Sequence, residues 1–541
     1  MSHDTADSAI AAAANELVVT AGSTALSPGE RAVDGVAETA GALADGLGRV
    51  RGDTERMAAA RDVWRALWSS RLLVWASGVA TVVAFGLGPL RHAFDPPGIM
   101  RGFGRLGDIL AAPAARWDAA WYLVIAHYGY RPDLGAFTAS RSAFFPLYPL
   151  SVSGVERLGA QPVLAGVLVS VVALAVALYG LHRLTTLEVT RLRRSRRGGL
   201  YGGRYGAGGR FRASNTVDAS EVARLVVMLT VFAPMAFYFS AVYSESLYLA
   251  VSVWVFLCAR RGRWGLVAVL GALASATRNT GVLLIAPAAL LYLYGPREDR
   301  DADHRPVEGQ RAKGDLRSDH ARGERRHWAP AGGVGLLARS GLLTVLEALR
   351  PRYRLRRDAL WLLLIPIGLG LYMAHLAIAG GDALAPFHAQ AVWERHFAGP
   401  FVGLWDGAKA AFEGARQLLS MQRTHVYFSA AGGSPFIDAG HNLMLFAFLA
   451  AAVPAIVGVV RLLPFAYGAY VLVALALPLS YPVAPQPLMS LPRFLLVLFP
   501  LNMWLAVRLV EHPRARAVAL GLSSVALMLF TAEFATWHWV A

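Results

Sequence analysis

The residues best suited to catalysis are an aspartate and the aromatic residues beside it, in the segment RWDAAWYLVIAHYGY at positions 116–130. A carboxylate that reaches water can take the proton from a hydroxyl group, which is the role of a general base. Asp118 is the candidate base for such a step. The rings of Trp117 and Trp121 offer flat apolar faces for a sugar ring, and His127 is a further candidate contact to an acceptor.

The same segment also has a purely structural interpretation. Residues 116–128 predict an interfacial amphipathic helix in an outside loop, with Trp117 and Trp121 near one face, because Trp and Tyr are enriched at membrane–water interfaces. In that interpretation the aromatic residues form an interfacial belt and Asp118 pairs with Arg116. If the segment binds a substrate instead, Arg116 is a candidate substrate contact.

The next aromatic segment, RSAFFPLYPL at positions 141–150, contains two prolines. Proline removes a helical hydrogen bond and its ring clashes with the preceding turn, so a regular helix cannot run through this segment. We expect a bent, aromatic-rich element at the entrance to the membrane, with Phe145 as a candidate substrate contact. An ordinary kinked entrance to a span is the alternative.

Two arginines at the predicted outer membrane edge are candidates for binding a phosphate group. Arg278 follows a short apolar run and Arg493 opens another. A charge in such a position is costly without a partner, and the planar guanidinium group matches a pair of phosphate oxygens. Asn279, next to Arg278, is a candidate substrate contact. In the alternative interpretation, both arginine side chains only extend to the membrane surface.

A second carboxylate, Glu245, lies in a tight turn at the same predicted depth. It could orient the sugar or the acceptor, or it could be an exposed turn residue beside a helix cap formed by Ser244. Two arginines and two carboxylates at one depth of a membrane protein predict a functional site more strongly than any one of them alone.

Histidines in the second outside segment, 380–435, do not predict a metal site. His388 and His396 lie too far apart in sequence for a compact zinc site, and His425 lies farther along the chain. We therefore expect no metal ligands and no cofactor from the sequence, and the dependence of the activity on a divalent metal is left open.

The elements that must position these residues are membrane helices. The chain has 541 residues, of which 55% are hydrophobic and 16% are charged, and its mean hydropathy is +0.43. A soluble domain carries about a quarter charged residues. The charges also gather in a few segments between long apolar runs, which is typical of membrane spans joined by aqueous loops. We predict an all-α polytopic membrane protein with about eleven transmembrane helices.

The predicted spans are apolar runs bounded by charged segments or by segments that contain glycine and proline. They are expected near residues 72–90, 162–186, 225–242, 246–259, 264–277, 281–294, 358–379, 440–460, 463–480, 492–510 and 515–536. A full crossing needs about 20 residues. The segment 264–294 is therefore predicted to form either two short spans or a re-entrant pair.

The charge distribution predicts the orientation of these spans. The net charge is +16, with 52 basic and 36 acidic residues. The basic runs adjoin predicted spans, so they indicate cytoplasmic loops that face anionic lipid, and nucleic-acid binding is not expected. The N-terminus is then cytoplasmic, and the candidate site lies on the extracytoplasmic face of the cell membrane. The single cysteine, Cys258, excludes an internal disulfide.

The predicted domain organisation is simple. Residues 1–65 lack the apolar core of a signal peptide and are expected to be a disordered or loosely helical cytoplasmic tail, and residues 66–541 are expected to form the transmembrane domain. The long segments between spans are assigned as cytoplasmic basic inserts at 187–224 and 295–357 and as outside loops at 91–143 and 380–435. Within the second insert, residues 334–349 are a candidate amphipathic helix on the membrane surface.

Taken in order, several segments resemble the PIG-V family of membrane mannosyltransferases, to which GPI mannosyltransferase 2 belongs. They are RWDAAWYLVIAHYGY (116–130), AFFPLYPL (143–150), YSESLYL (243–249), ALASATRNTG (272–281) and SLPRFLLVLFPL (490–501). The first two are the most specific. The chain departs from the family at 278–281, where it has Arg-Asn-Thr-Gly and the family commonly has Arg-Ser-Asn-Gly, so the role of Asn279 does not carry over directly.

The resemblance implies a GT-C type fold and an enzyme that uses a polyprenyl-phosphate sugar, usually mannose, as the donor. The carboxylate in the first outside loop is then the base, which corresponds to Asp118. The implied partners are the lipid-linked donor and membrane lipids. The arginine-rich composition, with Lys313 and Lys409 as the lysines, is typical of a GC-rich bacterial source, for which a GPI acceptor is not expected.

Two other functions explain part of the same pattern. A transporter or flippase for a lipid-linked sugar would use the outer charges as a substrate path. It predicts charges that continue through the membrane and inverted repeats, and the sequence has few charges within the predicted spans. A non-catalytic scaffold that stabilises another enzyme would need no base at position 118. The oligomeric state is not predicted.

Overall fold

The structure of the chain, a computed structural model, describes residues 30–86, 99–100, 104–130, 141–197, 218–299 and 351–541. Within these residues all regular secondary structure is helical. The chain divides into two compact units, residues 1–62 and 63–541. The first unit contributes the N-terminal part of one long helix, and every other described element belongs to the second. The predicted surface helix at 334–349 lies outside the described residues.

The helices differ widely in length, and the short ones include 3₁₀ helices, which are named η. The first part of the chain forms α2 (Glu30–Phe85), α3 (Arg105–Leu110), η2 (Ala112–Ala114), α4 (Ala119–Tyr128), α6 (Leu147–Glu156), α7 (Pro162–Arg197), α8 (Ala219–Val231), η4 (Ala236–Phe239), α9 (Glu245–Arg260), α10 (Trp264–Thr277), η5 (Asn279–Leu284) and α11 (Ile285–Tyr294). The second part forms η8 (Arg357–Leu364), α14 (Ile367–Gly380), α15 (Ala385–His388), η9 (Ala389–Trp393), α16 (Val402–Ser420), α17 (Pro435–Leu462), α18 (Phe465–Ser480), α19 (Leu491–Leu496), α20 (Phe499–Leu509) and α21 (Pro513–Ala535).

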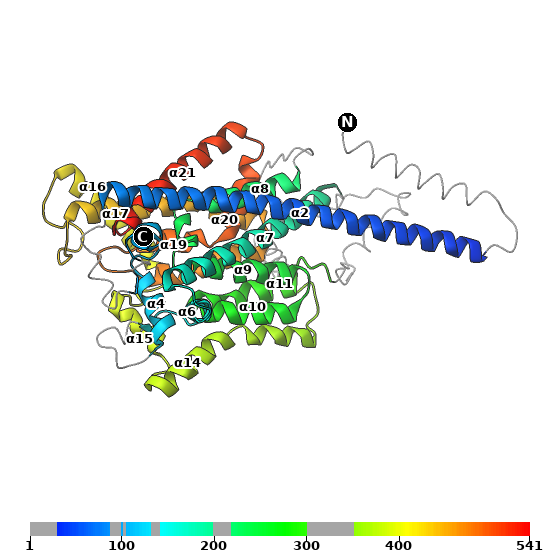
Figure 1. Ribbon diagram of the computed structural model, residues 1–541, viewed down its shortest axis with the longest axis horizontal. Coiled ribbons are helices and arrows are strands. Elements are labelled where there is room, and N and C mark those ends of the chain that lie inside the picture. Colours follow the sequence, from blue (N-terminus) through cyan, green and yellow to red (C-terminus); the bar gives the residue numbers. More distant parts are fainter. Residues whose placement is uncertain (1–29, 87–98, 101–103, 131–140, 198–217, 300–350) are drawn as a thin grey trace, which may run out of the picture. The chain divides into compact units, whose positions relative to one another are not determined.

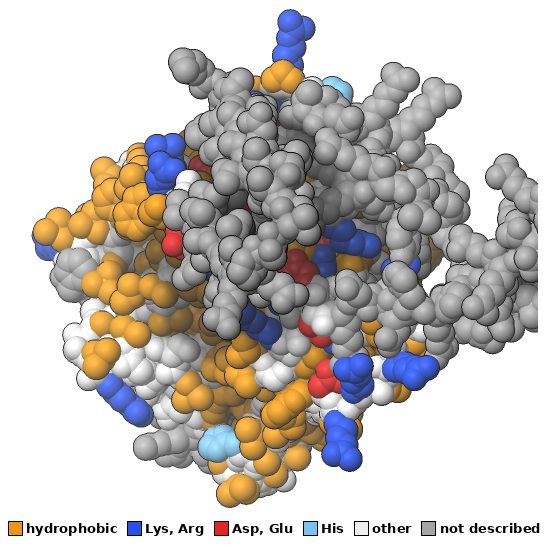
Figure 2. Space-filling model, turned by 90° about the vertical axis from the view of Figure 1, so that its right-hand side faces the viewer, with side chains coloured by type: hydrophobic (Ala, Val, Ile, Leu, Met, Phe, Trp, Pro, Cys, Tyr) orange, Lys and Arg blue, Asp and Glu red, His pale blue; other side chains and the backbone are white. Residues whose placement is uncertain are grey.

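Several helices are long and apolar enough to cross a membrane. Four meet this condition alone, at Asp53–Phe85, Pro162–Leu192, Pro435–Leu462 and Pro513–Ala535, and the pair η8 and α14, bent by 41°, adds a fifth if it is one span. Large apolar side chains are exposed along these helices, including Leu168, Val172 and Val176 on α7 and Leu522, Val525 and Leu529 on α21. Figure 2 shows such side chains over much of the visible described surface. Soluble proteins rarely expose so much apolar surface, so the chain is a helical membrane protein.

Prolines interrupt two of the predicted spans. In the predicted span 225–242, α8 stops before Pro234, because proline lacks an N–H group and disfavours the helical conformation in the residue before it. The predicted span 492–510 is divided into α19 and α20, with Pro500 in the first turn of α20. Residues 281–294 begin in the 3₁₀ helix η5 and continue as α11. The described helices therefore do not confirm the predicted number of spans.

Two helices extend into segments that are predicted to be irregular. Residues 30–65 are helical within α2, where the sequence predicts a disordered or loosely helical tail. α7 continues to Arg197, into the predicted insert at 187–224. The predicted interfacial helix at 116–128 is present as α4, although it begins only at Ala119.

The buried helix α9 organises the packing around the candidate site. It packs against α7 and α10 (Figure 1), and nearly all of its side chains are buried. A Cβ atom at Gly180 of α7 would lie 2.7 Å from the ring nitrogen of Trp254 in α9, so α7 and α9 approach closely where glycine leaves space. Glu245 begins α9 and Arg260 ends it. At 1.5 Å per residue these two charged residues lie about 22 Å apart.

A buried ion pair fixes the C-terminal end of α9. Arg260 bonds to Glu188 of α7, and both side chains are buried. The hydroxyl of Tyr467, from α18, donates to the same carboxylate at 2.9 Å, and Arg260 also donates to the carbonyl oxygen of Pro296 at 2.8 Å. These contacts join α7, α9 and α18 at the end of α9 that lies opposite Glu245.

Candidate active site

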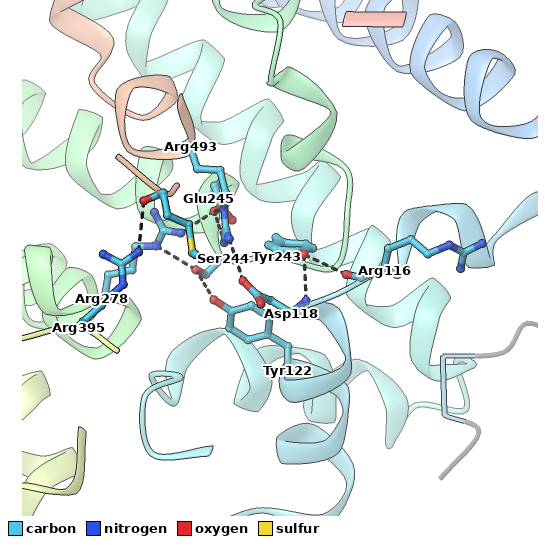
Figure 3. A network of polar contacts seen from close by, with 10 residues as sticks. Arg116, Asp118, Tyr122, Tyr243, Ser244, Glu245, Arg278, Arg395 and Arg493 are labelled. Carbon is cyan, nitrogen blue, oxygen red and sulfur yellow. Dashed lines mark hydrogen bonds and ion pairs between the residues drawn. The ribbon is translucent and has the colours of Figure 1, made fainter. Parts of the chain in front are cut away.

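Four charged side chains from separate elements meet at the N-terminal end of α9 (Figure 3). Glu245 begins α9, Arg278 follows α10, Arg493 lies in α19 and Asp118 directly precedes α4. All four are candidate site residues from the sequence, and the structure brings them into one network of ion pairs.

Arg493 joins the two carboxylates of this network. Its Nη1 donates to Asp118 Oδ2 at 2.8 Å, while Nε and Nη2 donate to Glu245 Oε1 at 3.1 and 3.0 Å. The guanidinium group lies over the rings of Tyr238 and Tyr243, 4.9 and 4.8 Å from their centroids. Only 8% of its side chain is exposed. A buried charge of this kind needs such partners, because desolvation without them is costly.

Arg278 binds the same oxygen of Glu245 as Arg493 does. Its Nη2 donates to Glu245 Oε1 at 2.5 Å and its Nε donates to the hydroxyl of Ser244 at 3.2 Å. The Ser244 hydroxyl also lies 3.0 Å from the Tyr122 hydroxyl. Ser244 is the residue before α9, as a cap would be, but its side chain makes no cap hydrogen bond. The second oxygen of Glu245, Oε2, is buried and accepts no hydrogen bond from the described residues.

The backbone before α4 directs Asp118 toward Arg493. The Tyr243 hydroxyl donates to the Arg116 carbonyl oxygen at 2.9 Å and accepts from the Asp118 N–H at 3.1 Å. Trp117 has a φ of 53°, in the left-handed region, which turns the chain sharply just before the helix. Asp118 is the residue before α4, yet its carboxylate makes no cap hydrogen bond. The carboxylate is 20% exposed, and the described residues place no hydrogen bond on its Oδ1.

An aromatic group lies beside the charged network. Trp121 stacks on Phe144, with ring centroids 5.7 Å apart, and Trp393 contacts both rings at centroid distances of 6.3 and 5.8 Å. Tyr122, which reaches Ser244, packs edge-on against Phe144 at 5.1 Å. We call Trp121, Phe144 and Trp393 the aromatic group. It adjoins the charged network through Tyr122.

A third arginine approaches the same network from the second outside segment. Arg395 follows η9, and its Nη2 donates to the carbonyl oxygen of Met489 at 3.3 Å (Figure 3). Desolvation, and then the positive charge of Arg493, lower the pKa of Arg395 to about 10, while the charge of Asp118 opposes this shift. The group therefore stays protonated near neutral pH.

Two of the predicted substrate contacts have structural partners instead. The Arg116 side chain points away from Asp118 (Figure 3), and its Nε donates to the carbonyl oxygen of Ala535 at 3.0 Å. The predicted alternative pairing of Arg116 with Asp118 is therefore wrong. The Trp117 indole donates to the carbonyl oxygen of His538 at 3.2 Å. Trp117 also lies outside α4, so it does not share a helical face with the tryptophan four residues later.

Two further candidates lie in other surroundings. His127 is 52% exposed, and its Nδ1 lies 3.8 Å from the Glu156 carboxylate. Phe145 is buried and packs against Tyr372, with ring centroids 5.4 Å apart, in a small separate cluster. The neighbouring residue Phe144 is the one that faces the aromatic group. The adjacent side chains diverge because residues 142–146, just before α6, are not helical.

Asn279 makes a local contact. Its side-chain oxygen accepts a hydrogen bond from the Thr280 N–H at 2.8 Å, at the start of η5. Gly281 lies two residues later, in close contact with α10, where a Cβ atom would be 2.0 Å from the carbonyl oxygen of Ala274. In this segment, Arg278 reaches the charged network and the residues after it fix the turn.

Sequence reasoning missed several residues of the site. Tyr122 is four residues from Asp118, and Tyr243 flanks Glu245, so proximity in sequence was an available signal. Trp393 and Arg395 carry no such signal, because they lie in a polar segment where aromatic and charged residues are common. Their place in the site follows from the tertiary fold alone.

A second polar pair lies apart from this network. The histidines of the second outside segment do not converge, but His425 bonds to Asp438 of α17 at 2.8 Å. This pair lines a small pocket between α16 and α17. Among the described residues, no three or more His, Cys, Asp and Glu side chains are arranged to hold a metal ion.

Comparison of the chain with protein-family models, with curated proteins and with solved structures finds no match.

Proposed function

We propose that the chain is an integral membrane glycosyltransferase that moves a hexose from a polyprenyl-phosphate donor to an acceptor hydroxyl. The proposed sugar is mannose, the proposed site of transfer is the extracytoplasmic face of the cell membrane, and the product is an α-glycoside. The proposed architecture is a GT-C transmembrane domain with about eleven spans. The resemblance of the site segments to the PIG-V family supports this assignment.

The observation that carries the proposal is the state of Asp118. Its carboxylate keeps contact with solvent, at 20% exposed, while its partner Arg493 is 8% exposed and Glu245 is fully buried. Arg493 engages only one of the two Asp118 oxygens. A carboxylate held in place by a buried arginine, with an oxygen left for a hydroxyl group, has the geometry of a general base.

The reaction follows from this geometry. The acceptor hydroxyl gives its proton to Asp118 as its oxygen attacks the anomeric carbon of the donor sugar. The bond between that carbon and the phosphate oxygen breaks, and its electron pair stays on the phosphate. Attack opposite a β-linked phosphate inverts the configuration, which gives the α-glycoside. A phosphate monoester is a stable leaving group, so a general acid is not required.

The two paired arginines suit the charge that develops on this phosphate. Arg278 and Arg493 lie on the same edge of Glu245, and preorganised cations in a buried site stabilise a developing negative charge strongly. Glu245 Oε2 is buried and accepts no hydrogen bond from the described residues. A buried polar atom without a partner calls for an explanation, and a hydroxyl group of the sugar or acceptor would supply the missing donor.

The competing transporter hypothesis is less well supported. A transport path needs polar groups that continue across the membrane. Between Glu245 and Arg260, the side chains of α9 are apolar apart from Ser246, Tyr248, Ser252 and Cys258. The two charged clusters at its ends, about 22 Å apart, are therefore separated by a mainly apolar helix.

The test is transfer of labelled mannose from polyprenyl-phosphate mannose in membranes that contain the full chain. Asp118→Asn keeps the size of the side chain and removes the base, so we expect transfer to fall about 100-fold or more. The matched control is Asp382→Asn, because Asp382 is 45% exposed and pairs with His388 at 2.8 Å, outside the network. We expect this control to match the wild type.

Each outcome has a distinct meaning. Transfer that survives in Asp118→Asn, with the control also active, would exclude Asp118 as the base. If wild-type protein that is shown to be folded transfers no sugar to any of several acceptors, a different donor sugar becomes the first alternative. Uptake or flipping of the lipid-linked sugar without transfer would favour the transporter.

A further inference from the structure

The charged network contains one cation more than its carboxylates neutralise. Arg278 and Arg493 pair with Asp118 and Glu245, and Arg395, at the left of Figure 3, lies close enough for the charges of Arg493 and Asp118 to act on it. Arg278 and Arg493 both bond to Glu245, and Arg493 also bonds to Asp118. Arg395 belongs to none of the described ion pairs, and its one described side-chain bond goes to the carbonyl of Met489. The five side chains therefore carry an excess of one positive charge.

The surroundings of Arg395 are those of a cation without its counter-ion. Its side chain is only partly exposed. Desolvation and the nearby Arg493 both destabilise its charge and lower its pKa to about 10. An anion bound beside it would offset both effects, because an opposite charge at close range favours the charged form. The network is therefore electrostatically incomplete on the side of Arg395.

The chemistry of the proposed reaction identifies the anion that would complete it. A sugar phosphodiester carries one negative charge, which equals the excess of the network. When the sugar leaves, the phosphate becomes a monoester with a second negative charge, and Asp118 becomes neutral by taking the acceptor proton. The summed charge of the three arginines, two carboxylates and phosphate is then zero before and after transfer. No ion has to enter or leave the buried site during the reaction.

The position of Arg395 also suits a phosphate that is attached to a sugar. Arg395 lies two residues after Trp393, and Trp393 contacts both Trp121 and Phe144. One segment therefore supplies both a guanidinium fork, which matches phosphate oxygens, and an aromatic face, which suits a sugar ring.

We propose that Arg395 is the phosphate-binding cation of this site and that it holds the phosphate of a polyprenyl-phosphate ligand beside the aromatic group. This assignment rests on the proposed function. The assignment adds to the proposed function a binding residue from the second outside segment. None of the sequence motifs includes this residue. Arg278 and Arg493 then fix the two carboxylates and add positive charge near the phosphate, and Arg395 makes the direct contact with the ligand.

The experiment measures binding without turnover. The purified full chain is titrated with decaprenyl phosphate and, separately, with decaprenol, which has the same tail and no phosphate. The variants are Arg395→Gln, Arg395→Lys and the control Arg416→Gln. Arg416 is 58% exposed on α16 and pairs with Glu413 at 2.7 Å, so its substitution removes the same charge at the surface.

We expect the wild type and Arg416→Gln to bind decaprenyl phosphate more tightly than decaprenol. Arg395→Gln should lose about 10- to 100-fold of the affinity for the phosphate, which is the range for a charged hydrogen bond, and keep its affinity for decaprenol. Arg395→Lys should recover part of the loss, because it restores the charge without the fork. If Arg395 only anchors its segment to Met489, both ligands would weaken together, and that result overturns the proposal.

Inorganic phosphate separates two sources of the anion. Competition by millimolar phosphate that depends on Arg395 would support a site that recognises phosphate itself. Binding of decaprenyl phosphate that resists this competition, and still depends on Arg395, would support a lipid-bound phosphate. Equal affinity of wild type and Arg395→Gln for decaprenyl phosphate, or no binding by the wild type, overturns the subsite. If the wild type transfers no mannose while Arg395→Gln still loses affinity for decaprenyl phosphate, the proposed function is overturned and the phosphate subsite stands.

Discussion

Among the described ion pairs, Arg493 is the residue that contacts both carboxylates of the site. Its three hydrogen bonds and its two tyrosine faces use the whole guanidinium group. A lysine could not reproduce this arrangement, because an ammonium group has no planar fork. The position of the Asp118 carboxylate, the proposed base, therefore depends on its pairing with Arg493.

Removing this arginine should destabilise the protein through Glu245. Arg493→Gln leaves a buried carboxylate with one partner fewer, and breaking a buried ion pair costs about 3–5 kcal/mol. Adding Glu245→Gln removes the buried carboxylate that lost this partner and kept only Arg278, so the double variant should recover part of that stability while transfer stays lost. Unfolding of the detergent-solubilised chain and the transfer assay measure the two effects. A double variant no more stable than Arg493→Gln would contradict this account.

Two adjacent phenylalanines offer a matched comparison of site and core. Phe144 stacks on Trp121, whereas Phe145 packs against Tyr372. Phe144→Ala should lower kcat/KM for transfer about tenfold, which corresponds to the loss of one aromatic contact of about 1.4 kcal/mol. Phe145→Ala should instead lower stability by about 3–5 kcal/mol and leave the kinetics of the folded fraction unchanged. The reverse pattern would show that Phe145, the sequence-based candidate, contacts the substrate.

The charged members of the site were predictable from sequence because they break apolar runs. Arg278 and Arg493 stand next to such runs, where a charge needs a partner, and Asp118 and Glu245 lie at the same predicted depth. Arg395 was not predictable, since a charge in a polar loop needs no explanation. Arg116 stands next to Asp118 in sequence, yet its side chain bonds to backbone carbonyl oxygens, one of them Ala535 at the end of the distant helix α21.

At the scale of elements, the short turn from α10 into η5 places Arg278. Gly281 allows η5 to fold back onto α10, because a Cβ atom there would lie 2.0 Å from the Ala274 carbonyl oxygen. No side-chain rotation relieves a clash with backbone, so the turn itself must move. The position of Arg278 therefore depends on a residue without a side chain.

Gly281→Ala should displace this turn and reduce both stability and transfer. The expected loss of stability is about 1–3 kcal/mol, the usual range for overpacking, and transfer should fall because Arg278 leaves Glu245. The control is Gly370→Ala in α14, where a Cβ atom meets nothing within 4 Å and alanine favours the helix. Unfolding and transfer assays on both variants test this. Equal behaviour of the two variants would exclude a steric role for Gly281.

Helices were predictable where charges mark their ends and not where prolines interrupt them. The predicted spans 246–259 and 264–277 agree closely with α9 and α10, because the basic turn between them punctuates the apolar sequence. The predicted span 225–242 fails at Pro234. Mean hydropathy does not reveal this break, because an interrupted apolar segment is as hydrophobic as a continuous one. Neighbouring helices can satisfy the backbone groups that the break leaves without a helical partner.

At the scale of the whole chain, the described charges are separated along α9. The site lies at its N-terminal end, and the buried pair of Arg260 and Glu188 lies at the other. The first cluster is built from short, irregular elements that leave a carboxylate partly exposed. The second joins α7, α9 and α18 directly. Tyr467 donates to Glu188 and Arg260 donates to the carbonyl oxygen of Pro296, although Glu188 Oε2 accepts no hydrogen bond from the described residues. The two ends of α9 therefore differ in exposure, because Asp118 at one end is 20% exposed and Arg260 and Glu188 at the other are buried.

The last prediction concerns the orientation of these two ends in the membrane. His396 is exposed and adjoins Arg395 at the site, while Glu298 is exposed and its N–H donates to the carbonyl oxygen of Arg260 at 2.9 Å. Cysteines at these positions, in a Cys258→Ser background, therefore report on opposite ends of α9. A membrane-impermeant maleimide should label His396→Cys in intact cells and Glu298→Cys only after permeabilisation, because basic segments stay cytoplasmic. If Glu298→Cys is labelled in intact cells and His396→Cys is not, the site lies on the cytoplasmic face. The proposed transfer at the extracytoplasmic face would then be wrong.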